Sequence, residues 1–317
     1  MNALRAVLIS VVALLAACSG PDRSPDNDSI PLAKTNSAKP LVVASNYPLY
    51  YFANQITDGV DGAPDIVLPA IDGDPASWMP NAEQIQLLQA ADIVILNGAG
   101  AEPWLDLITL NKRRLIDTSA TIADQLIPLD ASLLHQHGPE GERSHEDTAF
   151  TTWLDPKLAI AQAGVLADAL IELAPDAEQQ YRNNLVALKQ DLLKLDAELS
   201  RVFARLDGQH LLFSHPVYQY LERRYEINGK SLHWEPDEEP STTAWIELQQ
   251  ILATHRATIM IWEDWPLDET EAKLSNTGLV SIPFHTGANR PNDGDYFSIM
   301  YDNIKRLRPG RAAITDH

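Results

Sequence analysis

Residues 176–206 contain no Gly or Pro, and this run constrains the fold more than any other part of the sequence. Leucines recur along it at spacings of three and four residues, at Leu185, Leu188, Leu192, Leu195 and Leu199. The pattern predicts one amphipathic helix, roughly 45 Å long at about 1.5 Å per residue. A coiled-coil dimer helix is disfavoured, because the apolar repeat does not continue over further heptads.

Short apolar runs alternate with helical patterns on both sides of this helix. We predict strands at 41–44, 65–68, 92–96, 114–117, 209–213, 258–262 and 279–283. We predict helices at 49–56, 83–91, 104–110, 156–173, 217–225, 244–255 and 295–307. This alternation is typical of parallel βα units. We therefore predict an α/β fold: two βα lobes with parallel sheets, joined by a long rigid helix, with a ligand cleft between the lobes.

The first residues indicate export. Arg5 precedes an apolar stretch over 6–15, which is too short to span a bilayer, and small residues lead to Cys18. We predict a lipoprotein signal peptide at 1–18 with Cys18 lipidated; the alternative is an ordinary cleaved signal with an incidental Cys. The predicted domains are then a flexible tether at 19–40, an N-terminal lobe at 41–175, the linking helix at 176–206 and a C-terminal lobe at 207–317.

Charge and cysteine content exclude several classes of protein. The chain has 44 acidic and 24 basic residues and a net charge of −20, so we expect no nucleic-acid partner. The single Cys excludes a disulfide framework and a Cys-rich metal site. No later stretch approaches the ~20 apolar residues of a transmembrane helix. We expect an exported protein held to a membrane by lipid, facing the periplasm or the cell exterior.

Six segments, in order along the chain, resemble the cluster A metal-binding proteins that serve zinc and manganese ABC transporters. The likeness covers almost all of 41–310. The segments are VVASNYPLYYFANQI, AADIVILNGAGAEPWLDLI, TTWLDPKLAIAQA, LLFSHPVYQYLERRYEI, EPSTTAWIELQQIL and YFSIMYDNIKRL.

The resemblance implies a lipid-anchored, extracytoplasmic substrate-binding protein rather than an enzyme. Such a protein binds a divalent metal ion, here zinc before manganese, between two lobes and delivers it to an ABC permease in the membrane. The family usually holds the ion with three His and one carboxylate, or with two of each. These are ligands that suit a tetrahedral zinc ion.

The family's ligand positions carry over only in part. Ala76 stands where the first His is usual, and Thr151 stands where the second is usual, two residues before the Trp of the "WLDP" segment. His215 matches the third position and His285 the fourth. The resemblance thus implies His215 and His285 as metal ligands and no ligand at the other two positions.

Several other residues are candidates to complete such a site, although no spacing assigns them. They are Asp72, Asp74, His135, His137, His145, Glu263 and Asp264. The remaining histidines belong to no motif: His210, His233, His255 and His317.

Two other functions stay open. The altered positions are consistent with a homologue that has lost the metal and binds another ligand or a protein partner. Tryptophans near the expected cleft are candidates to line a pocket for an organic cation, or to pack in the core: Trp78, Trp153, Trp234, Trp262 and Trp265. An enzyme is disfavoured, because the adjacent Ser214 and His215 lack both a nucleophile-elbow motif and a placed acid.

Overall fold

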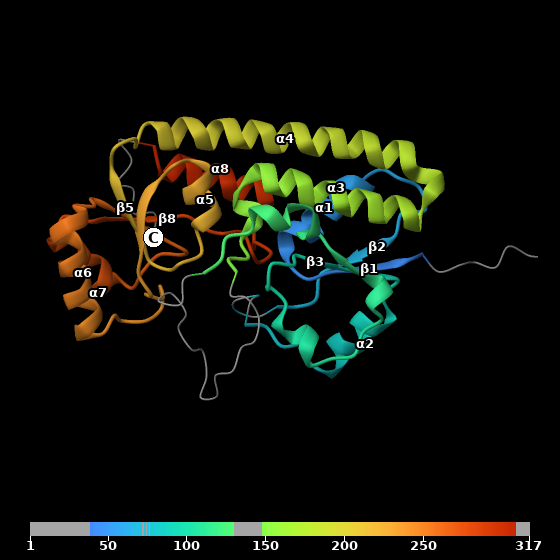
Figure 1. The fold of residues 1–317 in the computed structure, drawn as a ribbon, viewed down its shortest axis with the longest axis horizontal. Helices are drawn as coiled ribbons and strands as arrows, with labels where there is room; N and C mark the ends of the chain where they lie inside the picture. The colour runs from blue at the N-terminus through green and yellow to red at the C-terminus, as the bar shows by residue number, and fades with distance from the viewer. Residues whose placement is uncertain (1–38, 72, 74, 76, 130–147, 309–317) are drawn as a thin grey trace, which may run out of the picture. The chain divides into compact units, whose positions relative to one another are not determined.

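The protein is described here from a computed structural model, which covers residues 39–308 except 72, 74, 76 and 130–147. It contains two four-stranded sheets in which every pairing is parallel (Figure 1). The first has the strand order β2-β1-β3-β4 and the second the order β6-β5-β7-β8. The fold class predicted from the sequence, an α/β protein with two parallel-sheet lobes, is therefore confirmed.

The first sheet forms from short β-branched runs. Its strands are β1 (Leu41–Ala44), β2 (Asp65–Val67), β3 (Ile93–Leu96) and β4 (Leu115–Asp117). The central strands β1 and β3 are buried along most of their length, as expected for a sheet covered on both faces. Helix α1 (Tyr47–Thr57) follows β1, and the Asn46 side chain caps it by accepting from the Leu49 amide. Helix α2 (Ala82–Ala90) begins with a capping box at Asn81 and Gln84.

The second sheet repeats the same strand order. Its strands are β5 (His210–Phe213), β6 (Asn228–Ser231), β7 (Ile259–Trp262) and β8 (Val280–Pro283). Its helices are α5 (Gln219–Arg224), α6 (Thr242–His255), α7 (Asp268–Asn276) and α8 (Tyr296–Arg306). The sequence analysis did not predict β6 or α7. Strand β6 reads NGKS and lies at a sheet edge, so it needs no apolar run.

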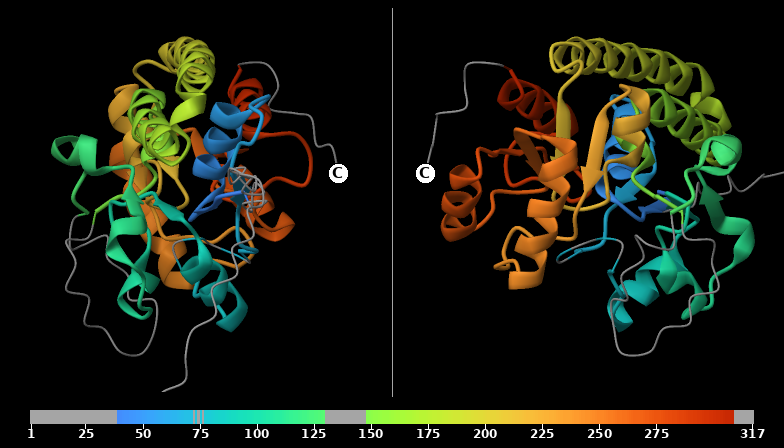
Figure 2. Two further views of the ribbon diagram at one scale, coloured as in Figure 1. Left: turned by 90° about the vertical axis from the view of Figure 1, so that its right-hand side faces the viewer. Right: turned by 60° about the vertical axis from the view of Figure 1, so that its left-hand side comes forward.

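Two long helices lie side by side over the sheets (Figures 1 and 2). Helix α3 (Pro156–Leu173) starts at Asp155, whose side chain accepts from the Lys157 amide, and it is followed by α4 (Glu178–Ala204). The leucine stripe of α4 is buried in one large apolar cluster that contains residues from both sheets. At the far end of α4, Asp196 accepts two hydrogen bonds from Arg224 of α5, at 3.0 and 2.6 Å.

Short 3-10 helices complete the described fold. They are η1 (Pro103–Asp106), η2 (Lys112–Arg114), η3 (Ala120–Gln125), η5 (Thr152–Leu154) and η6 (Pro175–Ala177). The longer helix predicted at 104–110 is thus wrong, and only the single turn η1 forms there. Among the described helices, none has both the length and the apolar content needed to cross a membrane.

Candidate metal site

The second sheet brings four chain segments to one edge. Parallel strands all end at the same edge, so the residues that follow β5, β6, β7 and β8 gather there. Hydrogen bonds between backbone groups fix these segments to one another: the amide of Trp234 donates to Ser214 at 2.8 Å, and the amide of Phe284 donates to Trp262 at 2.7 Å. Both predicted ligands, His215 and His285, lie in these segments.

Two carboxylates lie near one nitrogen of His215. Its Nδ1 atom lies 3.0 Å from Oε1 of Glu235 and 4.0 Å from Oε1 of Glu263. The imidazole side chain is 19% exposed, whereas the Glu235 side chain is 42% exposed. With its proton on Nδ1, on the side of these carboxylates, a neutral imidazole keeps the Nε2 lone pair that binds metals.

His285 is held from a different side. Asn303 of α8 accepts from the His285 amide at 3.0 Å and donates to its carbonyl at 2.8 Å. Burial, followed by the charge of Arg306, lowers the pKa of His285. Asp264 and a hydrogen bond with the backbone of Glu263 offset part of that change. The imidazole is therefore favoured in its neutral form, which a metal ion requires.

Two residues near His215 were missed by the sequence analysis. The His233 ring lies 5.8 Å from the His215 ring, edge to face, and Glu235 is the nearest carboxylate to its Nδ1. Both follow β6, so the unpredicted strand explains why their proximity was missed. Even so, within the described part of the chain no three side chains of His, Cys, Asp or Glu are grouped so that they could hold a metal ion.

The two altered ligand positions belong to the first half of the chain. Thr151 is 3% exposed, and its hydroxyl donates to the carbonyl of Val217, two residues after His215, at 2.5 Å. Nearby, Nε1 of Trp153 donates to the carbonyl of Thr286 at 2.8 Å. The segment at 151–153 is thus joined directly to the segments that carry His215 and His285.

At the edge of the first sheet where its strands end, one carboxyl group is buried. Glu102 is 8% exposed and accepts from the Ser45 hydroxyl at 2.6 Å, the Asn97 amide at 2.7 Å and the Gly98 amide at 3.1 Å. Burial raises its pKa to about 7, although these donors offset part of the effect. Gly98 has φ +74°, and a Cβ there would lie 1.9 Å from Oδ1 of Asp117.

The Glu102 side chain stabilises the turn after β3. A second set of hydrogen bonds connects this turn to residues 150–152, which include Thr151. The Asn97 side chain donates to the carbonyl of Phe150 at 2.8 Å and accepts from the Thr152 hydroxyl at 3.2 Å. Gln162 of α3 donates to Thr118 at 2.9 Å and to Asn97 at 3.2 Å. The position of Thr151 is therefore set by a buried polar network.

Four of the five candidate pocket tryptophans pack in the core. Their exposed fractions are 7% for Trp78, 2% for Trp153, 3% for Trp234 and 0% for Trp262, whereas Trp265 is 50% exposed. Of the two alternatives given for these tryptophans, packing in the core is therefore correct for four.

Two of the histidines without a motif pack against each other in the second half of the chain. The rings of His210 and His255 stack with their centroids 4.5 Å apart, and Nε2 of His255 lies 2.8 Å from the carbonyl of Leu211.

Several predicted residues lie outside the described part of the chain. They are Cys18, Asp72, Asp74, Ala76, His135, His137, His145 and His317. Their roles stay predictions.

Comparison with solved structures shows that this fold is shared with ZnuA-like proteins. The Zn(II)-bound ZnuA-like domain of AdcA from Streptococcus pneumoniae aligns with a TM-score of 0.70 at 20% identity, over 85% of this chain and 98% of that one. The similarity establishes the two-lobed fold of that class.

The sequence places the chain in a family. Residues 42–310 match the model of the ZnuA family, described as zinc-uptake complex component A, periplasmic, and the chain belongs to this family. It is 23% identical to the high-affinity zinc uptake system protein ZnuA of Bacillus subtilis (strain 168), over 95% of each chain. It is 24% identical to the manganese ABC transporter substrate-binding lipoprotein PsaA of Streptococcus pneumoniae, over 98% of this chain and 99% of that one. The family resemblance recognised in the sequence is confirmed.

Proposed function

We propose that this protein is the lipid-anchored, extracytoplasmic solute-binding component of a zinc- or manganese-type ABC uptake system. It binds a divalent metal ion and delivers it to a permease in the membrane, to which Cys18 tethers it. The family match over 42–310 supports the transport role, and relatives named for zinc and for manganese transport support the class of cargo.

His215 and His285 are the proposed protein ligands, with zinc as the preferred ion. The observation that carries this assignment is that each imidazole already has a polar partner outside the ligand set. Nδ1 of His215 lies 3.0 Å from Glu235, and the His285 ring bonds to the backbone of Glu263. Such partners orient a metal-binding imidazole and raise its basicity. A rotation of the Glu263 side chain, together with water, would complete the coordination of the ion.

Metal-dependent stabilisation tests the proposal. The protein is stripped with chelator, and its thermal unfolding is followed with Zn²⁺, Mn²⁺ or Cu²⁺. A ligand at 100 times its Kd adds about 2.7 kcal/mol to the free energy of unfolding. We expect His215→Ala and His285→Ala each to lose the zinc-dependent shift, while the control His210→Ala keeps it. If both variants retain the zinc-dependent shift, the metal binds elsewhere on the chain and the assignment of the two ligands is wrong.

A homologue that has exchanged the metal for another ligand is the second candidate. The hydrogen bond from Thr151 to Val217 favours it, because a hydrogen bond within the chain stands where the family places a metal-binding imidazole. Unfolding that is insensitive to all three metals in the wild-type protein would support this candidate. In that case, a Thr151→His, Ala76→His double variant should gain a zinc-dependent shift.

A further inference from the structure

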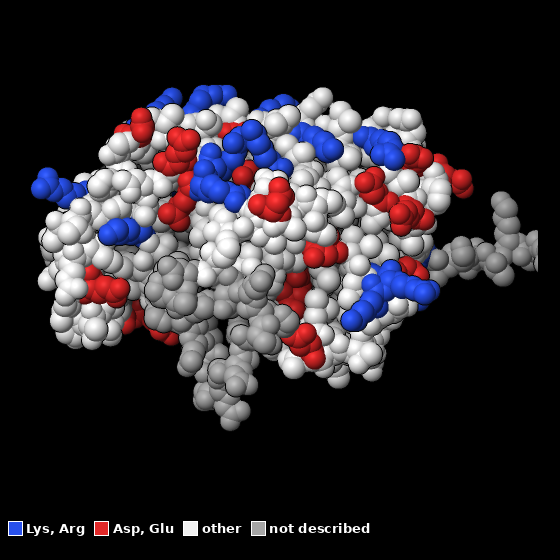
Figure 3. Space-filling view, in the orientation of Figure 1, with Lys and Arg blue, Asp and Glu red and all other residues white. Residues whose placement is uncertain are grey.

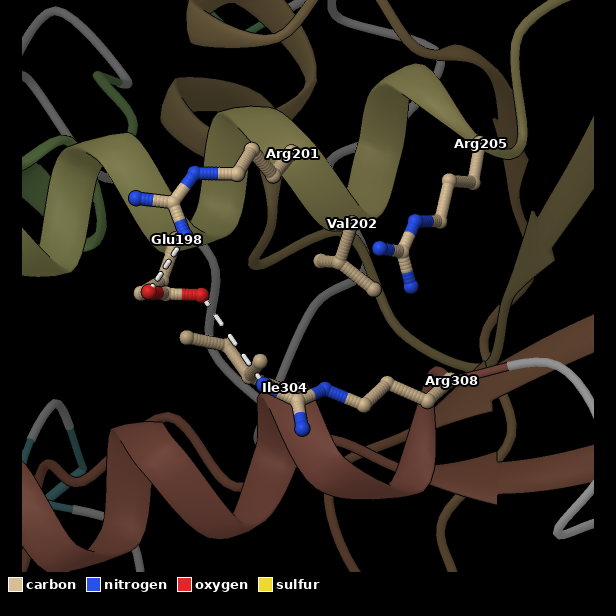
Figure 4. Close-up of a pocket in the computed structure, with 6 residues that line it drawn as sticks. All are labelled: Glu198, Arg201, Val202, Arg205, Ile304 and Arg308. Atoms are coloured by element: carbon tan, nitrogen blue, oxygen red, sulfur yellow. Dashed lines mark hydrogen bonds and ion pairs between the residues drawn. The ribbon is translucent and has the colours of Figure 1, made fainter.

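A cavity of about 280 Å³ lies where helices α4 and α8 end (Figure 4). Three arginines line it together with one acid and two apolar residues: Glu198, Arg201, Val202, Arg205, Ile304 and Arg308. Val202 and Ile304 are 3% and 2% exposed, so the apolar side of the cavity is part of the packed core. The charged side is open to solvent, because Arg201 and Arg308 are 63% and 56% exposed.

The charges in this cavity do not balance. Glu198 accepts a hydrogen bond from Arg201 at 2.5 Å, and its other oxygen lies 3.8 Å from Arg308. Arg205 has no carboxylate within ion-pair distance among the described residues. The lining therefore carries three guanidinium groups against one carboxylate, a surplus of two positive charges. In Figure 4 the guanidinium of Arg205 is turned toward the space between the two helices.

Helix ends explain part of this arrangement. Arginines in the last turn of a helix interact favourably with its dipole, and α4 ends at Ala204 while α8 ends at Arg306. That effect acts on each helix separately and needs no shared cavity. The chain has 44 acidic residues against 24 basic ones, and Figure 3 shows the two kinds mixed over the face that it draws. Three arginines around one hollow with a single acid depart from that pattern.

We propose that this cavity binds a small oxyanion with two negative charges, such as hydrogen phosphate or a short dicarboxylate. Arg205 is the principal contact, since its planar guanidinium matches two oxygens of one anion and no carboxylate competes for it. Arg201 and Arg308 flank the anion, and Glu198 opposes binding by holding them. Neither His215 nor His285 lines this cavity, so either proposal can fail without the other.

Isothermal titration of the purified, metal-free protein with sodium phosphate, and separately with sodium succinate, tests this site. Sodium chloride at matched ionic strength is the blank in each case. We expect saturable binding of at least one anion, weakened at least tenfold by Arg205→Gln. Glu198→Gln should tighten it about threefold, because a competing carboxylate is lost. Arg113→Gln, an exposed arginine far from the cavity in sequence, should leave it unchanged.

The two anions identify the ligand chemistry. Binding of phosphate alone indicates a phosphate site, and binding of succinate alone indicates a carboxylate site. Phosphate also stabilises folded proteins through exclusion from their surface, which is why direct titration is used rather than thermal unfolding. Absence of saturable binding for both anions would overturn the proposal, as would equal affinities for the wild-type, Arg205→Gln and Arg113→Gln proteins.

Discussion

Glu102 should make the stability of the protein fall as the pH rises from weakly acidic to weakly basic. The carboxyl group is fully enclosed by the turn after β3, and burial raises its pKa from 4.5 to about 7. In the unfolded chain the group is solvated and titrates near its ordinary value. The folded state therefore binds more protons between these two values, and stability is highest below the lower one.

The size of the effect follows from the difference between the two pKa values. Each pH unit between 4.5 and about 7 costs about 1.4 kcal/mol, so about 3 kcal/mol is lost by pH 8. Glu102→Gln removes this dependence, because an amide does not ionise. The amide places a donor against the Gly98 or Asn97 amide, which costs about 1 kcal/mol. We expect the variant to be less stable than wild type at pH 4.5 and more stable by about 2 kcal/mol at pH 8.

Urea unfolding at intervals from pH 4.5 to pH 8 measures this directly. Other groups also titrate in this range, so the informative quantity is the difference between the wild-type and Glu102→Gln curves. Glu247→Gln, an exposed acid on α6, serves as the control, and its curve should run parallel to that of wild type. Curves for wild type and Glu102→Gln that stay parallel across the range would refute the reasoning, since the group would then titrate alike in both states.

Two further substitutions test the contacts around the altered ligand positions. Thr151→Val keeps the shape but leaves the Val217 carbonyl without its donor, so we expect a loss of about 1–2 kcal/mol by urea unfolding; an unchanged midpoint would show that water replaces the hydroxyl. Gly98→Ala should cost about 3 kcal/mol, because the backbone is left-handed and the new methyl group collides with Asp117. Gly100→Ala, with φ +82° and open space around it, should cost only about 1 kcal/mol; equal losses would argue against the collision.

The sequence was informative where apolar periodicity was strong. The runs at 41–44, 93–96 and 259–262 are buried central strands, and their patterns predicted them. Edge strand β6 was not predictable in this way, because NGKS has no apolar alternation and forms only by pairing with β5. Helix α7 is rich in charge and buries few residues, so it too lacks a strong pattern.

The candidate site shows the same limit. His215 and His285 were found through family position, and their local strands place them at one edge of the sheet. The partners His233 and Glu235 depend on β6, so no local signal marked them. The exchange of an expected imidazole for Thr151 was visible in the sequence. Its bond to Val217 was not, because it joins residues 66 positions apart.

The two sheets have the same strand order, but the acid at the corresponding position in each half has a different environment. In each half an acid follows the third strand of that half, β3 or β7, and approaches a residue that follows the first, β1 or β5. Glu102 accepts a hydrogen bond from Ser45, and Glu263 lies 4.0 Å from His215. The first acid is closed off from water, whereas the second has a side chain that is 31% exposed. The same arrangement thus holds a buried turn together in the first half, and in the second half it leaves an acid accessible beside a proposed metal ligand. At pH 4.5, substitution of Glu102 should therefore lower the stability of the fold, whereas substitution of Glu263 should leave stability almost unchanged.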